Sequence, residues 1–164
     1  MCIRDRYQNY LIDGLRYIFI GGASIEQNTL AELSKIAPNA ELKQFYGSSE
    51  TSFITISDLL TPINSVGKAY PGVEIVLGDQ PDKPVSVGET GRVWVRSPYL
   101  FSKYVGENRS NINRFSDWVS PGELAKLDLD QNLFILGRID RIFKIKDQAI
   151  ICLLYTSDAA DDDA

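Results

Sequence analysis

The sequence predicts an α/β protein in which the end of a parallel βαβ layer is followed by a small antiparallel, barrel-like β subdomain. Two observations carry this prediction. Over residues 7–62, apolar runs of strand length flank a stretch whose apolar residues recur at helical spacing. Over residues 63–139, short strand-like runs alternate with glycine-containing turn signals, a pattern typical of antiparallel sheets. A single βαβ unit leaves strand edges unpaired, so we expect the chain to be part of a larger protein.

The α/β half follows from hydrophobic periodicity. The apolar run at 15–20 predicts a buried strand, and Ser24 with Gln27 forms a capping box at the start of a helix. The runs at 41–46 and 52–56 predict two further strands. A strand, a helix and a strand at this spacing form a βαβ unit, so the first two strands are expected to be parallel and covered on both faces.

The β half is predicted from shorter runs. Turn signals such as Gly-Asp and Gly-Glu-Thr-Gly separate them, and an Asp-Gln-Asn turn predicts a hairpin near its end. The polar segment 106–117 carries no strand prediction. The expected strands cover residues 73–77, 92–96, 124–128, 133–136 and 141–145.

The two ends of the chain have the character of cloning scars. Residues 1–6 read MCIRDR and residues 152–156 read CLLYT, and one inverted transposon-end adapter encodes both. We therefore expect 1–6 and 152–164 to be adapter artefacts, to be left out of fold reasoning. The alternative is a genuine, acidic, disordered tail. Without these ends, residues 7–151 hold 15 Lys and Arg, 17 Asp and Glu, a net charge of −2 and no cysteine.

Composition excludes several classes of function. The chain has no histidine, which removes most zinc sites, the Ser-His-Asp triad and the Cys-His dyad. A formal net charge of −5 argues against a nucleic-acid partner, because phosphate binding needs an excess of Lys and Arg. No apolar run approaches the roughly 18 residues of a membrane span, so none is expected.

The densest group of chemically useful residues is Tyr46-Gly47-Ser48-Ser49-Glu50, at the expected carboxyl end of a parallel strand. Ligands bind at this edge of open α/β sheets. Glycine allows close approach of a phosphate, hydroxyls donate to its oxygens, a carboxylate holds Mg²⁺, and the aromatic ring stacks on a base. Taken alone, such a loop is more often only a turn.

Five motifs in one order make the reading more specific. The motifs are Gly21-Gly22-Ala23, YGSSE, GETGRVWVRSPYLFSKY, DWVSPGELAKLD and GRIDRIFKIK. Together they resemble the adenylate-forming (AMP-binding) ligase superfamily, which contains acyl-CoA synthetases, non-ribosomal peptide adenylation domains and firefly-type luciferases. The resemblance covers nearly all of residues 15–148.

The resemblance implies roles for the first two motifs. Gly22 and Ala23 would line the adenine and acyl pocket. The YGSSE loop would enclose the nucleotide: Tyr46 stacks on adenine, with Gly47 and Ser48 beside it. Ser49 stands where the family has a threonine that contacts the phosphate or the acyl carbonyl, and Glu50 matches a glutamate that helps to hold Mg²⁺. Ser49 and Glu50 are thus the expected catalytic residues.

The later motifs imply a ribose site and a hinge. Glu123 stands where the family has an aspartate that accepts hydrogen bonds from the ribose hydroxyls, and it is one methylene longer. Arg138 matches an arginine of the ribose and phosphate region, and Asp140 matches the hinge residue of the small C-terminal domain, which would begin within 140–151. Arg138 and Asp140 could instead form a simple surface ion pair. After Lys144, the sequence departs from the family's glycine-rich turn.

The implied activity is that of an AMP-forming carboxylate–CoA ligase. A small carboxylic acid reacts with ATP in the presence of Mg²⁺ to give an acyl adenylate, and coenzyme A then displaces AMP. The need for ATP and CoA implies a cytoplasmic location. The phosphate loop would lie before residue 7 and the adenylation lysine after the chain, so we expect the isolated chain to be inactive.

Other classes stay open. The parent could be a non-catalytic relative that binds nucleotide or another protein, or a peptide-synthetase adenylation domain, although Ser48-Ser49 differs from the Pro-Thr usual there. Within the ligases, o-succinylbenzoate and aryl-CoA ligases are options. A self-standing β-rich binding module is disfavoured by the unpaired βαβ edge. The oligomeric state is not assigned.

Overall fold

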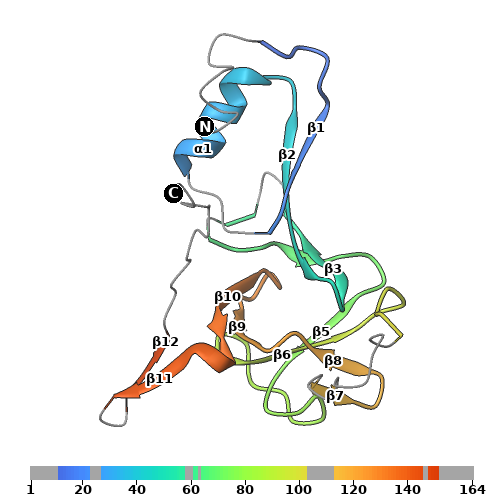
Figure 1. Ribbon diagram of the computed structural model, residues 1–164, viewed down its shortest axis with the longest axis vertical. Helices are drawn as coiled ribbons and strands as arrows, with labels where there is room; N and C mark the ends of the chain where they lie inside the picture. The colour runs from blue at the N-terminus through green and yellow to red at the C-terminus, as the bar shows by residue number, and fades with distance from the viewer. Residues whose placement is uncertain are drawn as a thin grey trace, which may run out of the picture.

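A computed structural model of the chain describes residues 11–22, 27–57, 61–62, 64–102, 113–145 and 148–151. These residues form a four-stranded sheet, a six-stranded sheet and a two-stranded sheet (Figure 1). The expected artefact segments 1–6 and 152–164 lie outside the described residues, as do Ala23 and Ser24.

The four-stranded sheet contains the predicted βαβ unit. Strand β1 (Tyr17–Ile20) pairs in parallel with β2 (Glu41–Ser48), and helix α1 (Gln27–Ile36) connects them (Figure 1). The helix is joined to the segment before β1 by a hydrogen bond from the Ile12 amide to the Ile36 carbonyl, at 2.7 Å. The parallel pairing is as predicted. The expectation that both faces are covered is wrong for the described residues, because Tyr17 and Phe19 are 49% and 60% exposed.

Strand β2 continues into a hairpin with β3 (Ser52–Ile56), and β4 (Lys68–Ala69) pairs with β3. The hairpin register shifts by one residue between Tyr46 and Gly47, so that Ile54 is the extra residue of a bulge. Ile54 is fully buried and belongs to the hydrophobic core that the second sheet forms. The bulge therefore joins the two sheets.

The second sheet is antiparallel and open. Its order is β10-β9-β6-β8-β7, with β5 on the other edge of β6. Among the described residues, its two end strands, β10 and β7, do not pair with each other, so the expected barrel-like closure is wrong. The strands are β5 (Glu74–Leu77), β6 (Gly91–Arg96), β7 (Asn113–Phe115), β8 (Trp118–Ser120), β9 (Glu123–Leu127) and β10 (Leu133–Arg138).

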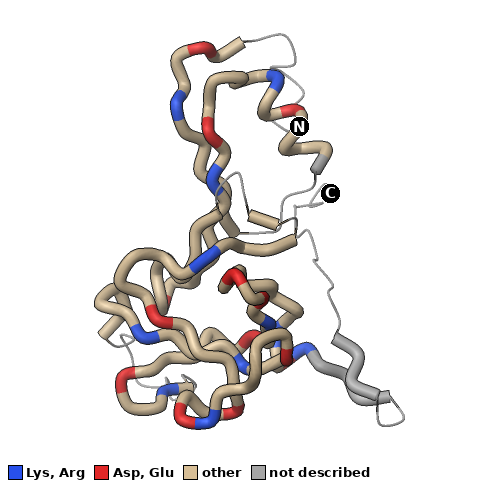
Figure 2. Tube along the Cα trace, turned by 180° about the vertical axis from the view of Figure 1, so that it is seen from behind, with Lys and Arg blue, Asp and Glu red and all other residues tan. Residues whose placement is uncertain are grey.

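The core lies mainly on this second sheet. Val93 and Val95 of β6 and Leu133 of β10 are fully buried, and they pack with Ile54 from the first sheet. Acidic and basic residues are interspersed along the strands around this core (Figure 2). Beyond β10, a 3₁₀ turn η2 (Ile139–Arg141) leads into a small antiparallel pair, β11 (Ile142–Ile145) and β12 (Gln148–Ile151).

Candidate functional site

A break between β8 and β9 sets the position of Glu123. Both strands run along the same edge of β6, but their registers differ by two residues, and Pro121 and Gly122 lie between them. Proline has no amide to donate to a sheet, and Gly122 has a φ of 86°, which L side chains rarely adopt. The Gly122 carbonyl accepts the amide of Ile139 at 2.8 Å. Glu123 thus begins β9 directly after a kink, which the positive φ of Gly122 allows and the hydrogen bond to Ile139 stabilises.

Arg138 is placed by the neighbouring strand. It pairs directly with Glu123 in the antiparallel register of β9 and β10, after a bulge between Ile135 and Gly137. Residues that face each other across two antiparallel strands put their side chains on the same side of the sheet. The Arg138 guanidinium also donates two hydrogen bonds to the Asp140 carboxylate, with Nε–Oδ1 and Nη2–Oδ2 distances of 3.0 Å each.

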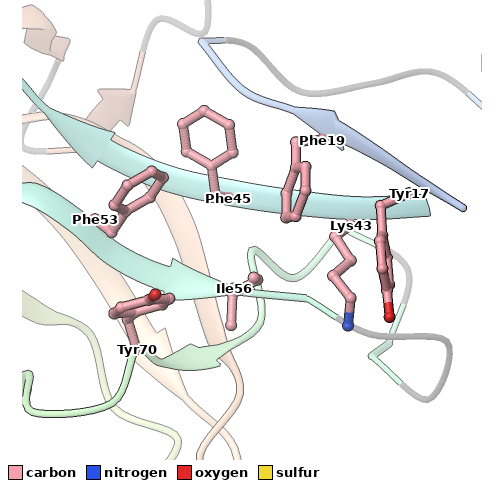
Figure 3. A pocket seen from close by; sticks show the side chains of 7 residues that line it. All are labelled: Tyr17, Phe19, Lys43, Phe45, Phe53, Ile56 and Tyr70. Carbon is pink, nitrogen blue, oxygen red and sulfur yellow. The ribbon is translucent and has the colours of Figure 1, made fainter. Parts of the chain in front are cut away.

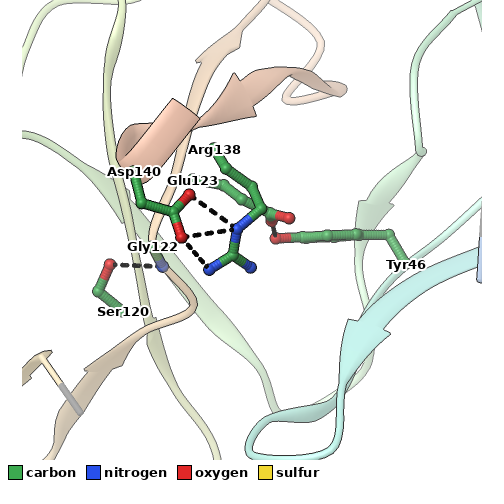
Figure 4. A network of polar contacts seen from close by, with 6 residues as sticks. All are labelled: Tyr46, Ser120, Gly122, Glu123, Arg138 and Asp140. Carbon is green, nitrogen blue, oxygen red and sulfur yellow. Dashed lines mark hydrogen bonds and ion pairs between the residues drawn. The ribbon is translucent and has the colours of Figure 1, made fainter. Parts of the chain in front are cut away.

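Tyr46 reaches the same point from the first sheet. Its hydroxyl donates a hydrogen bond to Oε2 of Glu123, which is 77 residues further along the chain (Figure 4). Its ring is partly buried against the hydrophobic core. The structure therefore brings together four predicted residues, Tyr46, Glu123, Arg138 and Asp140, at the junction of the two sheets.

Burial governs the electrostatics of this group. Desolvation raises the pKa of the Glu123 carboxyl, against the opposing effects of the Tyr46 hydrogen bond and the Arg138 charge. Burial and the nearby Glu123 charge raise the pKa of the Tyr46 hydroxyl well above its ordinary value. Asp140 is exposed, and the hydrogen bonds from Arg138 lower its pKa. The site therefore combines a neutral phenol, a partly desolvated carboxyl and an exposed ion pair.

The hairpin that follows Tyr46 is held by its own side chains. The Ser48 hydroxyl accepts the amides of Glu50 and Thr51 at 3.3 Å and lies 3.0 Å from the Thr51 hydroxyl. Thr51 is fully buried, whereas Ser49 is exposed. Gly47 has no room for a side chain, because a Cβ there would lie 1.9 Å from the Ser52 carbonyl oxygen.

The YGSSE residues, which were predicted to form a binding loop, make different contacts. Ser48 closes the turn, and the Glu50 carbonyl accepts the amide of Phe101 at 2.9 Å, which ties the hairpin to the segment after β6. Thr51 was not predicted to matter. The Ser-x-x-Thr spacing, which is typical of hydroxyl-closed turns, is the signal that could have identified it. Gly22 lies exposed just after β1, away from this turn in sequence.

The exposed face of the first sheet carries a groove of about 500 Å³ that was not expected from the sequence (Figure 3). Phe45 and Phe53 contact each other edge to face at 5.0 Å, and Phe53 stacks on Tyr70 at 5.5 Å. The period-two spacing of Tyr17 and Phe19 along β1 was the available signal. The groove is lined by Tyr17, Phe19, Lys43, Phe45, Phe53, Ile56 and Tyr70.

The described residues contain neither a helix that could span a membrane nor a cluster of metal-binding side chains. No helix among them is long and apolar enough to cross a bilayer. Nor do they contain a group of three or more His, Cys, Asp or Glu side chains placed to hold a metal ion.

Known proteins resemble the chain in sequence. Residues 2–105 match the family described as AMP-binding enzyme. A putative long chain fatty acid-CoA ligase, VraA, from Staphylococcus epidermidis is 36% identical over 130 residues, covering 78% of this chain and 26% of the relative. The acyl-CoA ligase easD from Emericella nidulans is 32% identical over 143 residues, covering 80% and 25%. The chain thus spans about a quarter of the length of these relatives.

Solved structures resemble it in fold. O-succinylbenzoate coenzyme A synthetase (MenE) from Bacillus subtilis, in complex with ATP and magnesium ion, superposes with a TM-score of 0.74 at 23% identity, covering 89% of this chain and 31% of that one. The amide bond synthetase McbA from Marinactinospora thermotolerans gives a TM-score of 0.70 at 26% identity, covering 84% and 29%. Since the family match extends over more than half of the sequence, the chain belongs to the AMP-binding enzyme family.

Proposed function

We propose that the chain is part of an AMP-forming carboxylate–CoA ligase and that Tyr46, Glu123 and Arg138 form the adenosine side of its nucleotide site. The observation that carries this proposal is the convergence of these three side chains from three strands of two sheets. Two of the similar proteins are named as acyl-CoA or fatty acid-CoA ligases, which supports the same reaction class.

The proposed reaction has two halves. A carboxylate attacks the α-phosphorus of ATP, giving an acyl adenylate and pyrophosphate, and the thiol of coenzyme A then displaces AMP. The first half needs no histidine base, because positioning and neutralisation of phosphate charge lower the barrier of this transfer. The cytoplasm supplies both ATP and CoA and is the proposed location.

Each residue of the cluster has a role that its chemistry fits. The Tyr46 ring offers a face for adenine, and stacking of this kind is worth about 1–3 kcal/mol. The Glu123 carboxylate accepts hydrogen bonds from the ribose hydroxyls, and Arg138 supplies positive charge beside it. Asp140, in the turn after β10, is the proposed hinge residue.

The hairpin and the end of β1 complete the proposed site. Because the Ser48 hydroxyl is engaged in the turn, Gly47 and Ser48 would shape the loop, while the exposed Ser49 hydroxyl would face the phosphate or acyl group. Gly22 and Ala23 would border adenine and the acyl group. The carboxylic acid itself is proposed only as a small molecule.

A magnesium ion could be bound by Glu50 together with the phosphates of the nucleotide. Mg²⁺ in nucleotide enzymes is bound by one or two carboxylates, with substrate phosphates and waters completing the shell. Glu50 is a single carboxylate on the hairpin, so it fits an ion carried mainly by the nucleotide. The ion would neutralise phosphate charge.

One observation favours a second candidate, a non-catalytic nucleotide-binding or interaction protein of the same family. The Glu123 carboxylate that would receive the ribose is already bonded to Tyr46. In such a relative, the contact would serve only to join the two sheets.

Binding of AMP to the purified chain tests the proposal. We expect a weak but saturable interaction, followed by ligand-observed NMR, that Glu123→Gln reduces because an amide is a poorer acceptor than a carboxylate. Glu74→Gln is the matched control, since Glu74 is an exposed carboxylate of the same sheet paired with Arg96. AMP binding that Glu123→Gln leaves unchanged would contradict the assignment. We expect no ATP–pyrophosphate exchange by the isolated chain.

A further inference from the structure

We propose that the Tyr46–Glu123 hydrogen bond is a latch between the two sheets, closed in the nucleotide-free chain and opened by the ribose of an adenine nucleotide. This inference rests on the proposed function, because it takes Glu123 as the acceptor of the ribose hydroxyls. It adds that the nucleotide competes for this acceptor with a residue of the chain itself.

The competition follows from the contacts of Glu123. Oε2 accepts the Tyr46 hydroxyl, and the side chain is only partly exposed at the start of β9. A ribose offers two neighbouring hydroxyls, and a carboxylate receives such a pair best with both of its oxygens. While the latch is closed, the Tyr46 hydroxyl holds one of the two acceptor sites of Oε2. Because the proposed function places adenine against the Tyr46 ring, the ribose approaches Glu123 from this side. Its vicinal diol therefore competes with the Tyr46 hydroxyl for Oε2, and it binds fully once that contact has opened.

When the latch opens, the negative charge of Glu123 keeps a positively charged neighbour. Arg138 faces Glu123 directly across β9 and β10, and Asp140, bound to Arg138, is the further charged group that acts on Glu123 (Figure 4). The Tyr46 ring is held by its packing against the core rather than by the hydroxyl alone. Because the phenolic oxygen is fixed to this ring, the contact opens when the Glu123 side chain turns away from it, and the ring stays where it can meet adenine.

The length of residue 123 bears on the latch. An aspartate would be one methylene shorter, which moves its oxygens away from Tyr46 while keeping the negative charge. Glu123→Asp should therefore open the latch without removing the ribose acceptor. This variant separates the latch from the carboxylate itself.

The first test asks whether the contact exists, without any nucleotide. Urea unfolding is measured for the wild type, Tyr46→Phe, Glu123→Gln and the double variant. Each substitution raises the unfolding equilibrium constant by some factor. We expect the factor for the double variant to be roughly tenfold smaller than the product of the two single-variant factors, the size expected of a hydrogen bond to a charged group. Tyr99→Phe, whose hydroxyl contacts the Pro71 carbonyl instead, is the control and should combine multiplicatively with Glu123→Gln. Multiplicative effects for Tyr46→Phe would overturn the latch.

The second test asks whether ribose opens it. Binding of AMP and of 2′,3′-dideoxy-AMP is compared for the wild type, Tyr46→Phe and Glu123→Asp. Because a closed latch reduces the competent fraction of the protein, we expect both variants to bind AMP roughly three- to tenfold more tightly. The dideoxy nucleotide, which has no diol, should bind Tyr46→Phe and the wild type equally.

The outcomes separate the two proposals. AMP binding with no gain in Tyr46→Phe, or with equal gains for both nucleotides, overturns the latch and leaves the proposed function standing. Binding of AMP by Tyr46→Phe but not by the wild type supports both. No AMP binding by any variant overturns the proposed function and the nucleotide-gated latch together, and the unfolding cycle then still decides whether the inter-sheet contact exists.

Discussion

The central strand of the six-stranded sheet buries its apolar side chains, whereas the four-stranded sheet leaves a row of aromatic rings exposed on one face. Val93 and Val95 of β6 are fully buried between β5 and the later strands. Tyr17 and Phe19 of β1 are exposed, and the groove of the first sheet lies over the same face. The two sheets thus differ in how far the described residues cover their apolar side chains.

The apolar side chains of β6 are covered by other parts of the chain, whereas the aromatic face of the four-stranded sheet is left uncovered by the described residues. A contiguous aromatic face is unusual on an isolated domain and is typical of an interaction surface. The chain spans about a quarter of its relatives' length. The site at the junction belongs to both, because Tyr46 comes from the first sheet and Glu123 from the second.

The largest expected effect comes from removing a buried side chain from the core of the six-stranded sheet. Leu133→Ala removes a fully buried side chain next to Ile54 and should lower the free energy of unfolding by about 3 kcal/mol. Phe19→Ala, on the exposed face, should change it by less than about 0.5 kcal/mol. Urea unfolding measures both. If the two substitutions cost the same, the contrast between the sheets is wrong.

The sequence carried much of this arrangement and missed identifiable parts of it. The βαβ unit was predictable because apolar runs of strand length flank a helix whose apolar residues recur at helical spacing. The hairpin of β7 and β8 falls in or just beyond the polar segment 106–117, and its two three-residue strands are too short for periodicity to register. It is held instead by a long-range contact, Trp94 against Phe115 at 6.4 Å.

The site was predictable only in part for a related reason. Motif order gave Tyr46, Glu123 and Arg138 as candidates, but their meeting depends on the Pro121–Gly122 break and on the bulge before Gly137. The direct bond between Tyr46 and Glu123 had no local signal, because 77 residues separate them. The aromatic groove was open to prediction from alternation, which was read only as a buried strand.

A smaller effect is expected at the hairpin that links the sheets. Gly47→Ala places a Cβ against the Ser52 carbonyl, and backbone atoms cannot move aside cheaply, so we expect a loss of about 1–3 kcal/mol in unfolding free energy. Gly14→Ala is the matched control, since a Cβ there meets no atom within 4 Å. Equal stability of the two variants in urea would show that the hairpin is looser than the structure has it.

The junction should also show a pH dependence of stability, which Glu123 carries. Burial raises the folded-state pKa of Glu123 above its unfolded value of 4.5. A raised pKa means that the folded chain holds this proton more tightly, so the resulting stability is present below pH 4.5 and is lost as pH rises through the folded pKa. Wild type should therefore lose stability relative to Glu123→Gln over that rise. A difference that stays constant, or reverses, in urea unfolding at several pH values would contradict the burial of this carboxyl.

The smallest effect is expected from the exposed ion pair beside the junction. Arg138 and Asp140 are 47% and 61% exposed, so their attraction is screened by water and salt. Asp140→Asn should cost no more than about 0.5 kcal/mol in unfolding free energy, and added salt should reduce even that difference. Glu74→Gln breaks the Arg96–Glu74 pair, which has similar exposure on the same sheet, and should cost about the same. A loss for Asp140→Asn well above that of Glu74→Gln would mean that Asp140 also holds the turn after β10, and hence the Arg138 guanidinium, in place against Glu123.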